Sequence, residues 1–205
     1  MDTSTISPTT LRDLAVLTAR GVSGGFYLAG GTGLAMHLAH RESYDLDFFS
    51  REQFGEDVLI ERLASTGSFS VEKKETGTVR GTFQETLVSF FYYPYPLLEP
   101  CVSALNIQVA SMPDIACMKL DALASRGAKR DFVDIYRILQ EGGLSLPRLL
   151  ELFEKKYAAI GYNLMHVKKG LVYFEDAEHE PMPRMQSPVA WDKIKKFFIG
   201  EARNL

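Results

Sequence analysis

The sequence has few of the features that mark secreted, membrane or metal-cluster proteins. Its 205 residues include only two cysteines, Cys101 and Cys117, which lack the close spacing of a metal site. No apolar run approaches the roughly 18 residues that a membrane-spanning helix needs. The start, MDTSTISPTT, has neither the basic nor the apolar segment of a secretory signal. These absences favour a reduced, cytoplasmic location with both cysteines in the core.

The sequence also lacks an excess of positive charge. Lys and Arg number 23 against 26 Asp and Glu, so the formal net charge is −3. This total gives no electrostatic indication of nucleic-acid binding, although it leaves room for a local basic patch. The apolar content of 46% and the length of 205 residues indicate one globular domain, or one domain with a helical extension.

The most informative stretch is FYLAGGTGLAMHLAHRESYDLDFFS, from Phe26 to Ser50. It opens with a short apolar run of strand type. A turn at Gly30-Gly31-Thr32 follows, and its glycines allow backbone N–H groups to approach a ligand. Thr32 is the predicted N-cap of a short helix over 34–39. The start of that helix would favour phosphate binding.

Two carboxylates end this stretch, on a predicted strand over 45–49. Asp45 and Asp47 share one face of the strand, because side chains at i and i+2 point the same way, and Leu46 and Phe48 point into a core. Mg²⁺ binds one or two carboxylates together with phosphate oxygens. A metal clamp beside a phosphate cradle favours phosphoryl or nucleotidyl transfer, whereas the two acids alone are equally typical of a solvated strand end.

A predicted helix over 114–126, capped by Ser111, carries two cations. Lys119 and Arg126 are seven residues apart and therefore lie along one face, with the small Ala122 between them. This spacing suits a shallow phosphate-binding groove, and two solvated surface charges are the alternative.

The next predicted helix, over 128–142, carries two acids. Asp131 and Asp134 are neighbours at i, i+3, and Arg130 and Arg137 are spaced to form ion pairs with Asp134. A salt-bridged surface helix is therefore one interpretation of this segment.

The remaining elements follow from periodicity, glycine and proline. Residues 1–8 are expected to be loose, and Thr9 or Thr10 to cap the first helix. Further helices are predicted over 11–20, 51–66, 144–157, 163–174 and 190–203, and strands over 69–75, 78–84, 86–98 and 103–111.

The glycine turn, short helix and Asp-x-Asp strand resemble the first motif of the DNA polymerase β-type nucleotidyltransferases. The finer pattern GGTGLAMHLAHRESYDLDFF resembles the AbiEii/AbiGii toxin-type family, in which an Arg and a Ser shortly precede the acids, as Arg41 and Ser43 do here. KLDALASRGAKRDFVDIYRIL resembles the second signature of that family, a Lys followed by an Arg-Asp-x-x-Asp helix. The resemblance covers residues 26–139.

The resemblance implies a role for each matched residue. Lys119 would bind a nucleotide phosphate, and Asp131 would act as a base or orient the attacking hydroxyl. Asp45 and Asp47 would hold Mg²⁺, and Arg130 and Asp134 would support the site. The nucleotide would contact Gly30, Gly31, Thr32, Arg41, Ser43 and Arg126.

One position departs from the wider superfamily. Its members place a third acidic residue on a strand like 86–91, where this chain has Ser89. The nearest acid, Glu85, lies at the start of that strand. The departure puts a site with three carboxylates and two metal ions in doubt.

The resemblance implies an α/β (α+β) fold, with a small mixed β-sheet flanked by helices over 1–112 and a helical region over 113–205. It also implies Mg²⁺-dependent transfer of a nucleoside monophosphate from a nucleoside triphosphate (NTP) to a hydroxyl. The acceptor would be an RNA such as the 3′ end of tRNA, and the protein would be a toxin with a cognate antitoxin. The alternatives are a non-catalytic nucleotide- or partner-binding regulatory module, and transfer to a protein or small-molecule hydroxyl.

Overall fold

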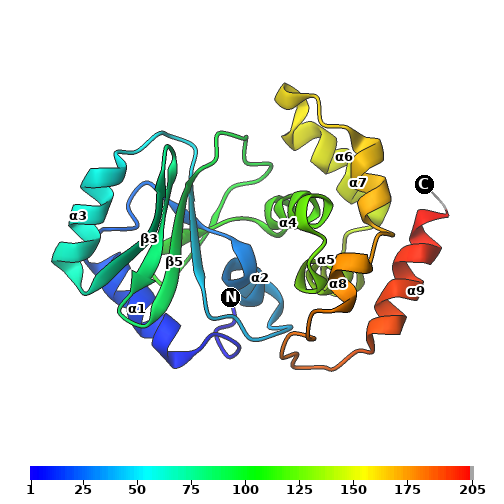
Figure 1. The fold of residues 1–205 in the computed structure, drawn as a ribbon, viewed down its shortest axis with the longest axis horizontal. Coiled ribbons are helices and arrows are strands. Elements are labelled where there is room, and N and C mark those ends of the chain that lie inside the picture. Colours follow the sequence, from blue (N-terminus) through cyan, green and yellow to red (C-terminus); the bar gives the residue numbers. More distant parts are fainter. Residues whose placement is uncertain (204–205) are drawn as a thin grey trace.

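A seven-stranded mixed sheet forms the centre of the first half of the chain in this computed structural model, which describes residues 1–203 (Figure 1). Its spatial order is β3-β4-β5-β2-β1-β7-β6. The pairs β2–β5 and β1–β7 are parallel, and the others are antiparallel. The strands are β1 (Tyr27–Leu28), β2 (Leu46–Ser50), β3 (Phe69–Glu75), β4 (Thr78–Phe83), β5 (Thr86–Tyr92), β6 (Val102–Ala104) and β7 (Ile107–Val109).

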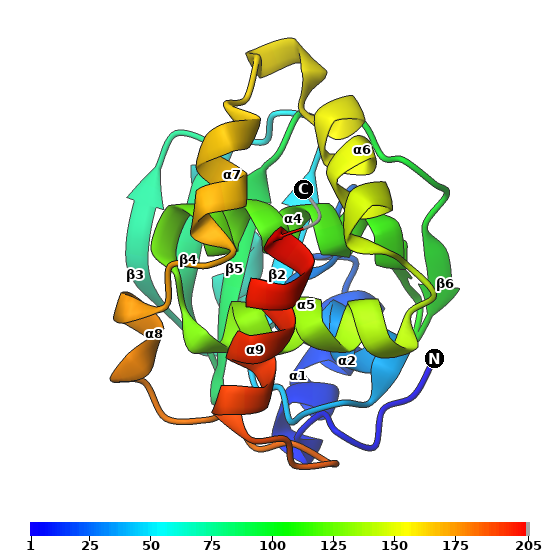
Figure 2. The same ribbon diagram turned by 90° about the vertical axis from the view of Figure 1, so that its right-hand side faces the viewer.

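Helices cover both faces of this sheet, and a helical region continues on one side. Figure 1 shows α1 and α3 on one face and α2, α4 and α5 on the other, and α9 lies over α5 in Figure 2. The helices are α1 (Pro8–Ala19), α2 (Gly30–Leu38), α3 (Glu56–Thr66), α4 (Met112–Arg126), α5 (Lys129–Glu141), α6 (Leu146–Lys156), α7 (Leu164–Gly170), α8 (Glu175–Glu178) and α9 (Trp191–Ala202), with a 3₁₀ turn at Ala158–Ile160. The predicted α/β class is confirmed.

The buried apolar side chains form two clusters. One lies between the sheet and the helices α1 and α3, and it includes Phe48, Val88 and Phe90. The other joins α4, α5, α6, α7 and α9 around residues such as Leu120 and Phe132. Side chains from β1 and α2 also belong to this second cluster, so the helical region packs directly on the first part. The division at 112/113 stays a prediction, and residues 204–205 of the predicted helical region lie outside the described part.

Of the predicted helix starts, that of α4 is confirmed and those of α1 and α3 are wrong. Ser111 caps α4 as predicted, because its side chain accepts a hydrogen bond from the Asp114 N–H. The cap of α1 is Ser7, not Thr9 or Thr10, since Pro8 suits the first helical position. Helix α3 begins only at Glu56, after Gly55.

Two segments differ from their predicted structure. The last predicted strand, 103–111, is part of a hairpin, β6–β7, whose turn at Leu105-Asn106 has two positive φ angles. Residues 1–8 are not loose, because Ile6 is buried and forms a β-bridge with Ser43.

Two long-range connections tie the tail to the sheet region. The first is a buried ion pair between Lys156 and Asp114, with Nζ and Oδ1 2.6 Å apart. The second is the segment 184–186, where the Glu42 N–H donates to the Arg184 carbonyl (2.9 Å) and the Gln186 N–H to the His40 carbonyl (3.0 Å). We call this segment the strap.

Within residues 1–203, none of the helices combines the length and the apolar character needed to cross a bilayer.

Candidate active site

Strand β2 presents acidic side chains to a cavity and apolar ones to the core, as its alternation predicts. Leu46 and Phe48 are fully buried, whereas Asp47 is partly exposed and Asp45 immediately precedes the strand. Both carboxylates line a cavity of about 500 Å³. Among the described residues neither forms an ion pair, so the chain leaves these two negative charges side by side without a direct counterion.

Ser89 stands beside Asp47, where the superfamily pattern predicts a third carboxylate. Parallel pairing sets Asp47 opposite Ser89, and β4 continues this row with Arg80 opposite Ser89. Paired residues of neighbouring strands project to the same face. A hydroxyl and a guanidinium therefore lie on the side of Asp47 where another acid was expected. Glu85, the nearest acid in the sequence, forms an ion pair with Arg12 (Oε1 to Nη2, 3.1 Å).

The predicted glycine turn is the first turn of helix α2, which begins at Gly30. A Cβ at Gly30 would lie 2.2 Å from Asp47 Oδ2, and one at Gly31 would lie 2.8 Å from Arg41 NH2. The glycines therefore make room for these charged side chains against the helix start. The backbone amides of this first turn have no acceptor within the helix, so they are available to an anion.

Thr32 is not the N-cap of this helix, which is Ala29. It is buried inside the helix, and its hydroxyl contacts the Asp45 carbonyl and lies 2.8 Å from Ser43 Oγ. Thr32 therefore links the helix to the backbone that carries the acids. This placement favours a supporting role over direct contact with a nucleotide.

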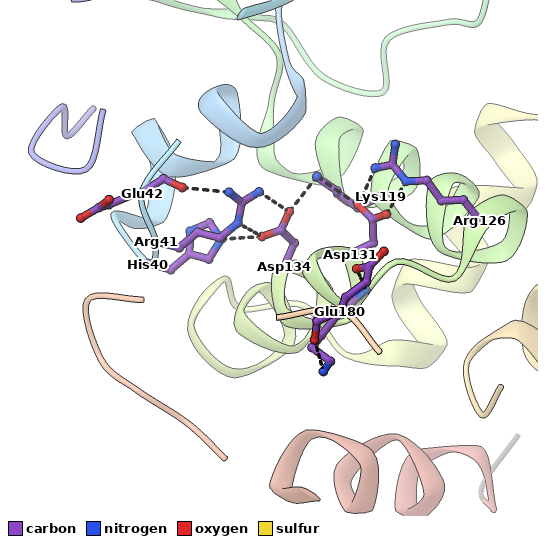
Figure 3. A network of polar contacts seen from close by, with 9 residues as sticks. His40, Arg41, Glu42, Lys119, Arg126, Asp131, Asp134 and Glu180 are labelled. Carbon is purple, nitrogen blue, oxygen red and sulfur yellow. Dashed lines mark hydrogen bonds and ion pairs between the residues drawn. The ribbon is translucent and has the colours of Figure 1, made fainter. Parts of the chain in front are cut away.

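Asp134 is the centre of a buried charge network that joins the two signatures (Figure 3). Its Oδ1 accepts from Arg41 Nε at 2.6 Å and lies 2.8 Å from His40 Nε2. Its Oδ2 accepts from Arg41 NH2 at 2.9 Å and lies 2.7 Å from Lys119 Nζ. The predicted pairing of Asp134 with Arg130 or Arg137 is wrong. Asp134 instead holds cations from two other elements in place.

Asp131 lies next to this centre and is fully buried. Its carboxylate accepts from Arg126 Nε (2.7 Å) and NH2 (2.9 Å), and Lys119 Nζ is 3.2 Å from its Oδ1. Both oxygens therefore face cations from α4 (Figure 3). This geometry favours a positioning role, and the role of base stays a prediction.

Asp134 and Asp47 have opposite electrostatic surroundings. Burial alone would raise the pKa of Asp134, but Arg41 and Lys119 hold that pKa well below its ordinary value. Burial raises the pKa of Asp47, and neighbouring Asp45 adds to the rise, while Lys119 and Ser89 partly offset it. Asp134 is thus stabilised as a negatively charged carboxylate, whereas the surroundings of Asp47 disfavour its negative charge.

A second cavity, of about 310 Å³, lies on the other side of Asp47 and Lys119. Its wall is largely aromatic and apolar, from residues Phe49, Phe91, Tyr92, Tyr93, Ile115 and Met118. It shares Asp47, Lys119 and Arg126 with the polar cavity. Residues from both sequence signatures therefore line both cavities, one polar and one largely apolar.

Comparison with known proteins gives this geometry a family. The sequence model of the family described as "Nucleotidyl transferase AbiEii toxin, Type IV TA system" matches residues 12–96 and 79–204. The chain belongs to this family. The AbiEii-family chain is also 36% identical over 197 residues to the uncharacterized protein aq_aa25 of Aquifex aeolicus (strain VF5), a match that covers 90% of each protein.

Two solved structures share the fold of this AbiEii-family chain. One is a candidate nucleotidyltransferase from H. pylori, with a TM-score of 0.59 and 17% identity over 97% of this chain and 95% of that one. The other is JHP933 from Helicobacter pylori, with a TM-score of 0.51 and 16% identity over 97% of each chain. The family and the nucleotidyltransferase-type fold that the sequence predicts are confirmed.

The residues present fit the divalent cation that the family implies. Asp45 and Asp47 offer hard carboxylate oxygens on one wall of the polar cavity, and the Ser89 hydroxyl adjoins them. No group of three His, Cys, Asp or Glu side chains suited to a metal occurs within residues 1–203. Two carboxylates are compatible with Mg²⁺, because this ion usually takes one or two protein carboxylates and completes its coordination with water and phosphate oxygens.

Three side chains of the site escaped the sequence-based prediction. His40, the residue before Arg41, is buried against Asp134. Arg80 and Arg184 line the polar cavity from β4 and from the strap. The His40-Arg41 pair shortly before the acids could have indicated His40. No local sequence pattern indicated Arg80 or Arg184.

Proposed function

We propose that this AbiEii-family protein transfers a nucleoside monophosphate from an NTP to an acceptor hydroxyl, with Mg²⁺ held by Asp45 and Asp47. One observation carries the proposal: the acids of the first signature and the cations Lys119 and Arg126 of the second line the same cavity. Two acidic ligands for a cation and two positive charges for phosphates are the parts that nucleotidyl transfer needs.

The chain's own residues bind and orient the nucleotide. The first amides of α2 and the side chains of Lys119 and Arg126 face the phosphates and stabilise the negative charge that develops on them. When bound, Mg²⁺ would neutralise phosphate oxygens and polarise the phosphorus centre. The acceptor hydroxyl releases its proton to solvent as its oxygen bonds to the α-phosphorus, the bond from the α-phosphorus to the bridging oxygen of the β-phosphate breaks, and pyrophosphate leaves with that oxygen.

In this proposal Asp131 and Asp134 act through the cations. Lys119 has two carboxylate partners, at 3.2 and 2.7 Å, which fix its ammonium group before substrate arrives. Arg126 has the bidentate contact to Asp131, yet half of its side chain remains exposed to the cavity. Preorganised cations lose little freedom on binding, which is the physical advantage of the network.

The acceptor we propose is an RNA hydroxyl, and the biological role is that of a toxin balanced by an antitoxin. The description of the AbiEii family supports the role of toxin. Growth arrest on expression of the parent protein, absent for Asp47→Asn, is the cellular test of that role.

The direct test is incubation of the protein with each α-labelled NTP, Mg²⁺ and total cellular RNA. We expect label in RNA with the parent protein and none with Asp47→Asn. Asp57→Asn, which changes an exposed carboxylate outside the cavity, is the matched control and keeps the parent's activity. Undiminished transfer by Asp47→Asn would contradict the metal-clamp assignment.

One observation favours a second candidate, a non-catalytic nucleotide-binding module. Ser89 and Arg80 replace an expected acid beside Asp47, so a third carboxylate is missing from this row. Mg²⁺-dependent NTP binding without label in RNA, protein or small molecules would support that candidate. Label in protein would instead make a protein hydroxyl the acceptor.

A further inference from the structure

Three arginines, Arg80, Arg130 and Arg184, lie at the wall of the polar cavity and come from three separate parts of the chain. We call them the arginine rim. Arg80 is on β4, Arg130 is in the first turn of α5, and Arg184 is in the strap. They differ from Arg41, Lys119 and Arg126, whose charges already face the buried acids of the network.

The arginine rim is only weakly neutralised by the protein. Arg184 is 81% exposed and lies 3.6 Å from Glu42, and Arg80 is 49% exposed and lies 3.5 Å from Glu72. Arg130 is exposed and has no ion pair within residues 1–203. Exposed pairs of this kind contribute little to stability, so their arginines can exchange a carboxylate for a phosphate at low cost.

The backbone nevertheless fixes where the rim lies. Arg80 shares the row of the sheet that contains Ser89 and Asp47, so it projects on the same face as the acid. Arg184 is held by the hydrogen bond of its carbonyl to Glu42, in the strap. The rim therefore leads from the outside of the cavity toward the β2 carboxylates.

An exposed aromatic side chain accompanies these charges. Tyr44 lines the same cavity, is 48% exposed, and follows directly after Ser43. Its hydroxyl donates to Glu42, the same carboxylate that lies near Arg184. Positive charge along a groove, together with an exposed aromatic ring, is the combination that binds single nucleic-acid strands.

We propose that the arginine rim binds the phosphodiester backbone of an acceptor strand close to its reactive end, with Tyr44 stacking on a base. This inference rests on the proposed function and adds the surface that binds the acceptor strand. The network cations serve the NTP, while the rim and its aromatic residue serve the strand. The chain's overall charge of −3 conceals this local arrangement.

The test compares strand binding with nucleotide binding in separate assays on the full chain. A 5′-fluorescein-labelled single-stranded RNA of about one dozen to two dozen nucleotides, consistent with single-strand site sizes, is titrated by anisotropy at several salt concentrations. The variants are Arg80→Gln, Arg130→Gln, Arg184→Gln, their triple combination, and Tyr44→Ala. Arg148→Gln, which removes an equally exposed charge from α6, is the matched control.

We expect each arginine variant to reduce the slope of log K against log salt by about 0.7, so the triple variant loses about 2. Tyr44→Ala weakens binding about fivefold or more with the slope unchanged, because stacking involves no counterion release. In each arginine variant the loss of NTP binding with Mg²⁺ is smaller than the loss of strand binding, since Lys119 and Arg126 serve the nucleotide phosphates. Arg148→Gln matches the parent in both assays.

Two results would overturn the inference. Unchanged strand binding in the folded triple variant would show that the rim does not contact the acceptor, and weakened NTP binding with unchanged strand binding would assign the rim to the nucleotide. Failure of the proposed function is distinguishable from failure of this inference. If the parent protein binds RNA through the rim but transfers no label, the strand-binding inference stands and the proposed reaction is contradicted. The same strand as DNA tests whether the sugar contributes to the affinity.

Discussion

The sharpest consequence of the charge network concerns the substitution Asp134→Asn. Asparagine has nearly the same shape, so packing is preserved while the negative charge is removed. Arg41 and Lys119 then stay buried with one fewer counterion, and the new amide group turns N–H donors toward other donors. The contacts at 2.6, 2.7 and 2.9 Å to these two side chains all depend on the carboxylate.

The expected loss of unfolding free energy is about 3–5 kcal/mol, the cost of removing one partner from a buried ion pair. For a chain of this size each kcal/mol lowers the melting temperature by about 2–4 °C, so the total decrease is about 6–20 °C. The folded pKa of Asp134 is depressed, so its stabilisation is present above the unfolded value of about 3.9 and is lost as the pH falls through the folded pKa. The difference in unfolding free energy between parent and variant is therefore constant near neutral pH and becomes smaller below about pH 4.

Asp47→Asn is the matched comparison, because it is the same chemical change in the same site. The folded pKa of Asp47 is raised, so its ionisation costs stability at neutral pH and the variant should be as stable as the parent or more stable. Glu151→Gln, in an exposed pair with Arg148, sets the scale for a surface charge. Urea unfolding at pH 7 and thermal melts without Mg²⁺ measure all three. A loss below about 1 kcal/mol for Asp134→Asn, or an equal loss for Asp47→Asn, would refute the reasoning.

Two further predictions concern other parts of the fold. Gly30→Ala should reduce nucleotidyl transfer more than tenfold, because the added Cβ would lie 2.2 Å from Asp47 Oδ2. The control is Gly161→Ala, which has a similar positive φ but open space around it. It should lower the stability only by the backbone strain and keep the activity. Lys156→Met should lower the unfolding free energy by about 3–5 kcal/mol in urea titrations, because it leaves a buried carboxylate without its partner. The exposed neighbour variant, Lys155→Met, should have little effect, and similar losses for the two would contradict the assignment.

Local patterns predicted the parts of the site that depend on one element at a time. The alternation along β2 predicted that Asp47 and Phe48 point to opposite faces of the strand, and the structure agrees. The seven-residue spacing placed Lys119 and Arg126 along one side of α4, where both line the cavities. These inferences succeed because strand and helix geometry fixes the direction of each side chain.

The remaining features depend on contacts that no local pattern contains. Asp134 was assigned to arginines one turn away, yet its partner Arg41 lies 93 positions earlier in the chain. Burial explains the choice: a fully buried carboxylate needs several donors, and the packing of α5 against α4 and the segment before β2 supplies them. The contribution of Arg184 likewise follows from where the strap returns to the sheet region, which spacing does not encode.

The strap also has a consequence for how the protein becomes active during synthesis. Residues 1–112 emerge first and contain both Asp45 and Asp47, but Arg41 would then lack its partner Asp134, and the cavity would lack every cation from α4 and α5. The strap at 184–186 can close onto His40 and Glu42 only after residue 186 has left the ribosome. Chains that end before the strap should therefore lack the Arg184 part of the arginine rim, and the proposed strand binding should reach its full strength only after residue 186 is made.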